Sequence, residues 1–534
     1  MRSECLPFRQ IPHTTPLFTD FLSYSSQVQQ FYPRSPYFNQ WFKEEAGAGR
    51  YDNQRREQVC AILERQSRAR GASSATMQNI ARLRNGAFAA VTGQQVGLFG
   101  GPAFSIYKAL TAVKLADAAT RGGIDCVPIF WLATEDHDLA EVNHTSLPGP
   151  DGLLQTLTAT GEGIQDAPVG TLTFGGEIES LVKTAGDLLG DSDALAALRD
   201  SYRAGETFAT AFAKFFTRIF ADYGVILLDA SDPELHRIAA PIYRAAIERA
   251  PELDEALLIR GRELDSAGYH QQVKVASSTL LFNLRNGARV SVQRSENDDS
   301  TFSIEDGRIS RDDLLQQISR APQNFSPKAL LRPVVQDYLL PTLAYVGGPA
   351  EVAYFAQAGV VYKALLGKVT PIVPRFSATL IEQKPQAILS HFELAFSDVL
   401  SGTIREKLAA RALPAELQTA FDTAKLSLDN SLQSIRAALT RLDKTLVDAA
   451  DNTASKMKYQ LENLGEKAAR AELRQNEVLD RKAAYLGNAL YPNKTLQERE
   501  LPGVYFLARY GTDLLRGLYD CIHPDCLDHQ VISL

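Results

Sequence analysis

Short runs of apolar residues recur along the chain and alternate with segments of helical character. The runs occupy residues 87–92, 127–133, 224–229, 343–346 and 368–375. A run of this length is typical of a strand that is buried on both faces of a parallel sheet. Helices are expected after the first and fourth runs, at residues 103–119 and from residue 350 onward. Strands that alternate with helices predict an α/β fold built on a doubly wound parallel sheet.

Two less regular segments interrupt this alternation, and we interpret them as insertions. In the second, apolar and polar residues alternate over 279–284 and 288–292, which predicts a small β-hairpin. The expected organisation is a core in three parts (1–150, 216–240, 326–385), insertions at 151–215 and 241–325, a helical domain at 386–498, and a C-terminal segment, 499–534, that returns to the core.

Within the helical domain, apolar residues repeat at intervals of four and three. The series are Leu428, Leu432, Ile435, Leu439, Leu442, Leu446 and Ala449, followed by Met457, Leu461, Leu464, Ala468 and Ala471. Sustained heptads of this kind are typical of coiled-coil packing. The polar residues 451–453 predict the turn of a helical hairpin, although one continuous helix also fits the pattern. We interpret this arm as a dimerisation element; the alternative is a pair of helices that packs only on its own domain.

The length and composition are those of a multidomain globular protein. The chain has 534 residues, of which 45% are hydrophobic and 22% charged, so that a large core can form. Its 56 Lys and Arg against 63 Asp and Glu residues give a net charge of −7, which argues against general nucleic-acid binding. Neither a membrane-spanning run nor a signal peptide is recognisable. We therefore interpret the five cysteines as thiols of a cytoplasmic protein.

A glycine-rich turn occurs twice, each time between an apolar run and a helix. Gly-Gly-Pro-Ala lies at 100–103 and at 347–350, and neither copy has the pattern of a Walker or dinucleotide-binding loop. Glycines before a helix N-terminus can hold an anion, and proline favours the first helical turn. We expect both turns to face one crevice, although a structural turn would use the same residues. The first turn contributes the candidate binding residues Thr92, Gly93, Gln94, Gln95, Gly100, Gly101, Pro102, Tyr107 and Lys108.

The second apolar run leads into a cluster of ionisable residues. Side chains at the carboxyl ends of parallel strands commonly form the ligand site, and carboxylates with an imidazole can transfer protons or bind a metal. We expect His137, Asp136 and Asp138 to be catalytic, with His137 as the base because its usual pKa lies nearest neutrality. A helix cap would use the same run. Further candidate binding residues nearby are Trp131, Glu135, Asn143 and, after the third run, Asp229.

Two other patterns are given no catalytic role. Cys521, His523, Cys526 and His529 are zinc-binding residue types, but their spacing differs from that of the usual cysteine pairs, and we assign no metal site. Residues 455–458 (SKMK) superficially resemble the lysine loop of class I aminoacyl-tRNA synthetases. Because they lie in the heptad region, we interpret them as part of the coiled coil.

Taken together, the long motifs resemble those of the cysteine-adding enzymes of bacillithiol biosynthesis. The segments that carry the resemblance are 91–108 (VTGQQVGLFGGPAFSIYK), 128–138 (PIFWLATEDHD), 331–341 (LRPVVQDYLLP), 344–354 (AYVGGPAEVAY) and 529–531 (HQV). Their order, the chain length and the heptad region all agree, so that the resemblance spans essentially the whole chain.

The resemblance implies a Rossmann-like core with connective-peptide insertions, similar to class I aminoacyl-tRNA synthetases, and a coiled coil that forms a homodimer. It also implies the last step of bacillithiol synthesis, in which the carboxyl group of L-cysteine is joined to the amine of glucosaminyl-malate. Activation of cysteine with ATP or another adenine nucleotide would follow from the synthetase-like core, although the chain lacks the His-x-Gly-His motif. In this scheme Gly347 and Gly348 hold a phosphate or admit the sugar, and Arg332 and Arg375 bind the malate carboxylates.

Two other functions remain open from the sequence. One is a synthetase-like ligase that acts on another amine or on tRNA. The other is a non-catalytic scaffold in which the coiled coil is the functional part. The acidic net charge speaks against tRNA as the substrate.

Overall fold

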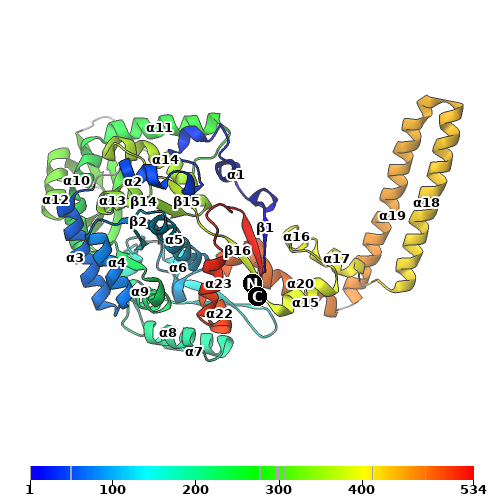
Figure 1. Ribbon diagram of the computed structural model, residues 1–534, viewed down its shortest axis with the longest axis horizontal. Coiled ribbons are helices and arrows are strands. Elements are labelled where there is room, and N and C mark those ends of the chain that lie inside the picture. Colours follow the sequence, from blue (N-terminus) through cyan, green and yellow to red (C-terminus); the bar gives the residue numbers. More distant parts are fainter. Residues whose placement is uncertain are drawn as a thin grey trace.

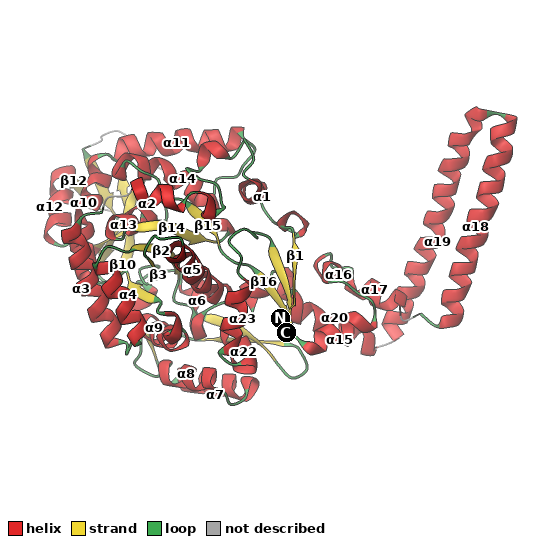
Figure 2. Ribbon diagram, in the orientation of Figure 1, coloured by secondary structure: helices red, strands yellow, loops and turns green. Residues whose placement is uncertain are grey.

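The computed structural model describes residues 2–48, 51–275, 278–295, 300–305, 307–411, 413–475 and 477–534. Its centre is a five-stranded sheet in which every pair of neighbouring strands is parallel (Figures 1 and 2). This sheet confirms the predicted α/β core. The strand order is β15 (Ile372–Pro374), β14 (Thr342–Gly347), β2 (Phe88–Gln94), β3 (Cys126–Leu132) and β8 (Ile226–Asp229).

Both faces of the sheet are covered, which explains why its strands are apolar without interruption. Every residue of β3 is buried. Phe130 and Leu132 belong to one hydrophobic core with α5 (Phe104–Arg121) and α9 (Phe208–Ile219). Ile129 and Trp131 belong to a second core with helices on the opposite face, α3 (Asn53–Ala69) and α10 (Pro233–Glu248). Alternate side chains of one strand therefore hold the two helical layers together.

The second insertion contains a larger sheet than its sequence indicates. The predicted hairpin is confirmed as β9 (Ser278–Arg285) and β10 (Ala288–Arg294), but it is part of a five-stranded antiparallel sheet. The other three strands have three or four residues each, which is too short for a visible alternation. They are β11 (Thr301–Ile304), β12 (Gly307–Ser310) and β13 (Phe325–Pro327), and α11 (Ala250–Ser266) and α12 (Arg311–Arg320) complete the insertion.

The two ends of the chain meet in a third, small sheet. The N-terminal strand β1 (Arg2–Leu6) pairs with the C-terminal strand β17 (His529–Ser533), which also pairs with β16 (Ala378–Ile381). Figure 1 shows both termini at this point, between the main body and the helical arm. None of the helices in the described part of the chain combines the length and the apolar character that a membrane span needs.

The helical arm is an antiparallel hairpin that projects from the body (Figure 1). It consists of α18 (Ala415–Leu442) and α19 (Val447–Gln475), joined by a single 3₁₀ turn at Lys444–Leu446. The coiled-coil hairpin is thus confirmed, and the alternative of one continuous helix is wrong. Salt bridges tie the two helices together, with Arg436 to Asp451 at 2.8 Å and Lys458 to Asp429 at 2.7 Å.

The predicted position of the hairpin turn, residues 451–453, is wrong. The chain leaves the helix at Asp443, whose φ of −158° and ψ of 118° are extended and whose carboxylate accepts hydrogen bonds from the amide and hydroxyl of Thr445. Leu442 and Leu446 continue the heptad spacing across this turn by coincidence, and that concealed the break. Asp451 lies inside α19. Its side chain accepts a hydrogen bond from α18 and does not cap a helix.

A buried ion pair attaches the C-terminal segment to the sheet domain. The guanidinium of Arg375, in the loop after β15, lies 2.5 Å from a carboxylate oxygen of Glu498 in α21 (Gln497–Glu500). Glu498 is completely buried and also accepts hydrogen bonds from the Ser377 hydroxyl and the Ala378 amide. Since each charge is expensive to bury alone, the pair fixes the position of α21.

Replacing Glu498 by glutamine leaves the Arg375 guanidinium buried without its counter-charge. Removing one partner of a buried pair typically costs about 3–5 kcal/mol. We therefore expect Glu498→Gln to lower the midpoint of thermal unfolding by roughly 5 °C or more, measured by calorimetry. Glu462→Gln, on the exposed surface of α19, is the control and should leave the midpoint nearly unchanged. Equal midpoints for the two variants would contradict this role of the ion pair.

Candidate active site

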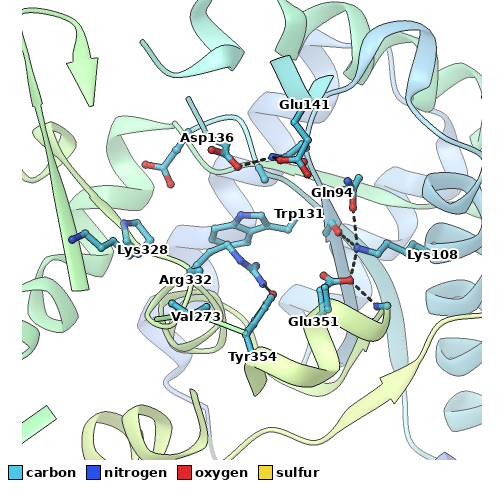
Figure 3. Close-up of a pocket in the computed structure, with 18 of the residues that line it drawn as sticks. Gln94, Lys108, Trp131, Asp136, Glu141, Val273, Lys328, Arg332, Glu351 and Tyr354 are labelled. Carbon is cyan, nitrogen blue, oxygen red and sulfur yellow. Dashed lines mark hydrogen bonds and ion pairs between the residues drawn. The ribbon is translucent and has the colours of Figure 1, made fainter. Parts of the chain in front are cut away.

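A cavity of about 550 Å³ lies at the carboxyl ends of β2, β3 and β14 (Figure 3). Ligand sites of doubly wound sheets occur at this edge, and the volume suits a small-molecule substrate. Gly93 brings β2 close to Trp131, since a Cβ atom there would lie 3.0 Å from the Trp131 carbonyl oxygen. The cavity contains the predicted residues Gly93, Gln94, Gln95, Lys108, Trp131, Glu135, Asp136, His137, Arg332, Gly348 and Arg375.

A buried ion pair forms the floor of the cavity. The ammonium of Lys108, on α5, lies 2.5 Å from a carboxylate oxygen of Glu351, on α14 (Pro349–Leu366). Lys108 also donates to the carbonyl oxygen of Gly93 and the amide oxygen of Gln94, while Glu351 accepts from the amide of Gly348. Burial raises the pKa of Glu351, but the neighbouring ammonium outweighs it and holds that pKa below its usual value. The floor is therefore charged on both sides and neutral as a whole.

Arg332 forms a second, cationic part of the cavity. It begins α13 (Arg332–Leu339) and donates to the hydroxyl oxygens of Tyr354 at 2.7 Å and Tyr345 at 3.3 Å. Its other terminal nitrogen donates to the side-chain oxygen of Gln336. Figure 3 shows the guanidinium between Trp131 and Tyr354. Neutral hydroxyl and amide groups thus orient Arg332.

The predicted acid–base residues Asp136 and His137 lie on the opposite side of the cavity. The side-chain amide of Gln95 donates to Asp136 at 2.7 Å and to Glu141 at 2.8 Å, which holds the two carboxylates together. The imidazole of His137 packs edge-on against Phe282, and its Nδ1 lies 3.7 Å from Asp136. This Nδ1 is buried and makes no hydrogen bond within the described part of the chain.

Glu135 faces the cavity from a more deeply buried position. Its carboxylate lies 3.4 Å from Nε2 of His236, on α10, and the Nδ1 of that histidine contacts the hydroxyl of Tyr243. Burial raises the pKa of Glu135 to about 8, although the positive charge of Arg289 opposes this shift. Burial also lowers the pKa of His236 to about 4. Both shifts favour neutral side chains near pH 7, so the contact is a neutral pair.

The second insertion supplies the remaining wall. The guanidinium of Arg289 lies 4.1 Å from the ring centroid of Phe282, and the ammonium of Lys328 lies 5.0 Å from the same centroid. Arg289 is also 3.9 Å from Asp136. Burial and the neighbouring charge of Arg289 lower the pKa of Lys328 to about 8. Two cations therefore stack on one aromatic ring, and one of them, Arg289, borders the carboxylate of Asp136.

The first Gly-Gly-Pro turn does not line this cavity, so the hypothesis that both turns face one crevice is wrong. Only the second turn does so, through Gly348. The amide of Gly100 already donates to the hydroxyl of Tyr202, and a Cβ atom at Gly100 would lie 2.6 Å from Phe215. Gly101 and Pro102 continue the turn, and Ala103 bonds to the C-terminal segment at Leu501. The first turn therefore serves packing.

The remaining predicted binding residues and Asp138, which was predicted to be catalytic, lie outside the cavity. The Thr92 hydroxyl donates to the carbonyl oxygen of Val346, and Tyr107 is buried against Phe376. Asp229 accepts a hydrogen bond from Thr134. Three further positions are Asp138, which caps α6 (Leu139–Val142), Asn143, which ends that helix, and Gly347, which lines an adjoining cavity.

The four zinc-type residues near the C-terminus are not arranged around a common point. The ring nitrogens of His529 bond to the hydroxyls of Ser377 and Thr379 inside the protein. Cys526 instead contacts Cys5 of β1, with the two sulfur atoms 2.9 Å apart. Among the described residues, no group of three or more His, Cys, Asp or Glu side chains is placed to hold a metal ion.

Several cavity residues lay beyond the reach of the sequence argument. Glu351 had a local signal, because it occupies the third position of a helix that begins after Gly348, where a carboxylate caps the helix. No such local signal exists for Phe282, Arg289 and Lys328, because nothing in the second insertion indicates which face its sheet turns toward the core.

The raised pKa of Glu135 predicts how stability changes with pH. In the unfolded chain this carboxyl ionises near its usual pKa, whereas in the folded protein it stays protonated up to about pH 8. The folded state therefore loses stability as pH rises between these values. Glu135→Gln cannot ionise, so that relative to the parent protein it should gain roughly 2–5 kcal/mol between about pH 5 and about pH 9. Thermal unfolding across this range measures the difference, and Asp138→Asn is the control. A difference that does not change with pH would contradict the assignment.

Two family models match the chain from end to end. The N-terminal Rossmann-like domain of bacillithiol biosynthesis BshC matches residues 1–376, and the C-terminal coiled-coil domain of the same family matches residues 378–534. These ranges meet between β15 and β16, where the central sheet ends and the small terminal sheet begins. The Rossmann-like and coiled-coil parts of the structure thus correspond to the two domains of this family.

Similar proteins match over their full length. A protein of Koribacter versatilis is 49% identical and one of Solibacter usitatus 36% identical, with 100% of each chain covered in both cases. A third, from Salinibacter ruber, is 31% identical over 99% of this chain and 100% of its own. All three are named as candidate cysteine ligases, BshC. The resemblance seen in the motifs is therefore confirmed, and the chain belongs to the bacillithiol biosynthesis BshC family.

Proposed function

We propose that this protein is a ligase that joins the carboxyl group of L-cysteine to the amine of glucosaminyl-malate in the last step of bacillithiol biosynthesis. The observation that carries the proposal is the full-length similarity to proteins named as candidate cysteine ligases. The cavity supports it, because carboxylates and cations face one another in a space of about 550 Å³. The free thiols of the chain fit a reducing cytoplasm.

Amide formation requires that the acceptor amine lose a proton. In the proposed step, the ammonium group transfers this proton to the imidazole of His137, and the amine lone pair attacks the activated acyl carbon. The C–N bond forms as the bond to the leaving group breaks, and the second proton that the nitrogen must lose departs with the leaving group. Asp136, 3.7 Å from the imidazole, stabilises the positive charge that develops there. The short helix that follows Asp138 leaves both side chains at the cavity.

The attack also places negative charge on the acyl oxygen. Lys328 and Arg289, which stack on Phe282, provide positive charge on this wall of the cavity. Fixed positive charge of this kind stabilises a developing oxyanion because it needs no reorganisation during the reaction. The amide of Gly348 is not available for this role, since it donates to Glu351.

Activation of cysteine is proposed to use ATP or another adenine nucleotide. The cysteine carboxylate would attack the α-phosphate, so that an acyl adenylate forms and pyrophosphate leaves. The first glycine turn does not suit the phosphates, because the Gly100 amide is bonded to Tyr202. The cationic side chains of the cavity are better placed, and cysteine-dependent exchange of pyrophosphate into ATP would detect the intermediate.

Dimerisation is proposed through the helical hairpin. Several apolar heptad residues stay largely exposed in the single chain, with Ile435 at 52%, Met457 at 48% and Leu464 at 56% exposed. An apolar seam of this kind is stabilised when a second hairpin covers it.

Variants of the neighbouring residues Asp136 and His137 test the active site. Asp136→Asn and His137→Ala should each lower kcat/KM for ligation by about 10²–10⁴-fold, because each removes a group of the proton-transfer step. Asp138→Asn is the matched control. The Asp138 carboxylate lies outside the cavity, so this variant should retain near-normal turnover. The assay combines protein, ATP, L-cysteine and glucosaminyl-malate and detects the product by mass spectrometry. Full activity in all three variants would contradict the assignment.

Variants of the apolar seam test the dimer. Ile435→Glu combined with Leu464→Glu places two charges in the seam, and we expect the dimer to dissociate to monomers in light-scattering measurements. Gln433→Glu, at an exposed polar position of α18, should leave the mass unchanged. A parent protein that is already monomeric would refute dimerisation through the arm.

A further inference from the structure

A second, smaller cavity adjoins the first. Its volume is about 210 Å³, and it shares Gly348, Pro349, Arg375 and Arg499 with the larger cavity. Its other walls come from two segments far apart in the sequence, residues 8–18 near the N-terminus and residues 491–499 before the C-terminal helices. The two cavities therefore adjoin at these shared residues.

The positive charge at this junction is incompletely neutralised. Arg375 is paired with the buried Glu498 at 2.5 Å. The side chain of Arg499, the next residue along α21, makes no hydrogen bond or ion pair within the described part of the chain, and its guanidinium lies 5.8 Å from the ring centroid of Phe104. Burial and the charge of Arg375 lower the pKa of Arg499, although the carboxylates of Glu498 and Glu141 act in the opposite direction. An anion bound at this junction would neutralise the positive charge of Arg499.

Other groups in the walls also favour an anion. Lys494 adds an ammonium group, and His13 adds a polar side chain. His13, Asn493 and Lys494 have φ values of 63°, 50° and 58°, a left-handed conformation that is uncommon outside glycine. Strain of this kind persists where the surrounding structure holds a segment in a required position. Both segments are thus shaped around the smaller cavity.

We propose that the smaller cavity is a dicarboxylate-binding subsite and that Arg499 is its principal anchor. The proposal rests on the proposed function, and the occupant is the malate end of the acceptor, whose amine then points into the larger cavity. The arginines chosen from the sequence are less suited to this task, because Arg332 is held by tyrosine hydroxyls and Arg375 by Glu498. A guanidinium binds a carboxylate through two parallel hydrogen bonds, which gives orientation as well as attraction.

Acceptor discrimination tests the subsite. The kcat/KM for glucosaminyl-malate is divided by that for methyl glucosaminide, which carries the same amine but no carboxylates. We expect Arg499→Ala to lower this ratio by about 10–100-fold, the usual effect of losing a charge-assisted hydrogen bond. Arg499→Lys should recover part of the ratio, because it retains the charge but not the planar fork. Arg516→Ala, a surface position on α23 (Asp513–Cys521), is the control and should leave the ratio unchanged.

Two other results would overturn the subsite. An unchanged acceptor ratio in Arg499→Ala, with normal ligation by the parent protein, would refute it and leave the proposed function intact. A rise in KM for ATP instead of the acceptor would assign Arg499 to nucleotide phosphates.

Binding without turnover separates the subsite from the proposed function. L-malate and pyrophosphate are titrated separately into the full-length protein, and the midpoint of thermal unfolding is followed. L-malate should stabilise the parent protein and not Arg499→Ala, even if no ligation is detected, in which case the proposed function alone would fail. Stabilisation by pyrophosphate and not by L-malate would exclude the dicarboxylate as the occupant.

Discussion

The ion pair between Lys108 and Glu351 is the interaction around which the cavity is organised. It joins the helices that follow the two glycine-rich turns, at the carboxyl ends of β2 and β14. Two buried charges are tolerated only when they are paired and their remaining hydrogen-bonding groups are satisfied. Here Lys108 also donates to the carbonyl of Gly93, and Glu351 also accepts from the amide of Gly348. The floor is fixed for this reason, and Asp136 and His137 lie on the other side of the cavity.

The walls are built from parts of the chain that are distant in sequence. The second insertion adds Phe282, Arg289 and Lys328, while α21 adds Arg499. Glu498, the neighbour of Arg499, is held by Arg375 inside the protein. The buried charge of Glu498 therefore positions the neighbouring charge of Arg499 at the cavity. The same logic applies to Gln95, whose amide holds Asp136 and Glu141 together.

The core strands and part of the site could be predicted because their signals are local. An apolar run such as 127–133 indicates a strand buried on both faces, and the ionisable residues directly after it lie at the ligand edge. Repeated sequence patterns predicted the structure less well. The two Gly-Gly-Pro turns have the same sequence, but at the first one Phe215 and Tyr202 fill the space where a ligand would bind. The heptad spacing likewise continued through Asp443, where the helix ends.

The sequence by itself determined the parallel sheet, the coiled-coil region, the family and the position of Asp136 and His137 at a strand end, because each depends on residues close together in the chain. The tertiary structure alone decided which cations face those residues. Arg289, Lys328 and Arg499 lie in an insertion and a C-terminal segment whose local patterns carry no information about orientation. Their placement follows from packing and from buried charge pairs, and such long-range contacts have no signature in a single stretch of sequence.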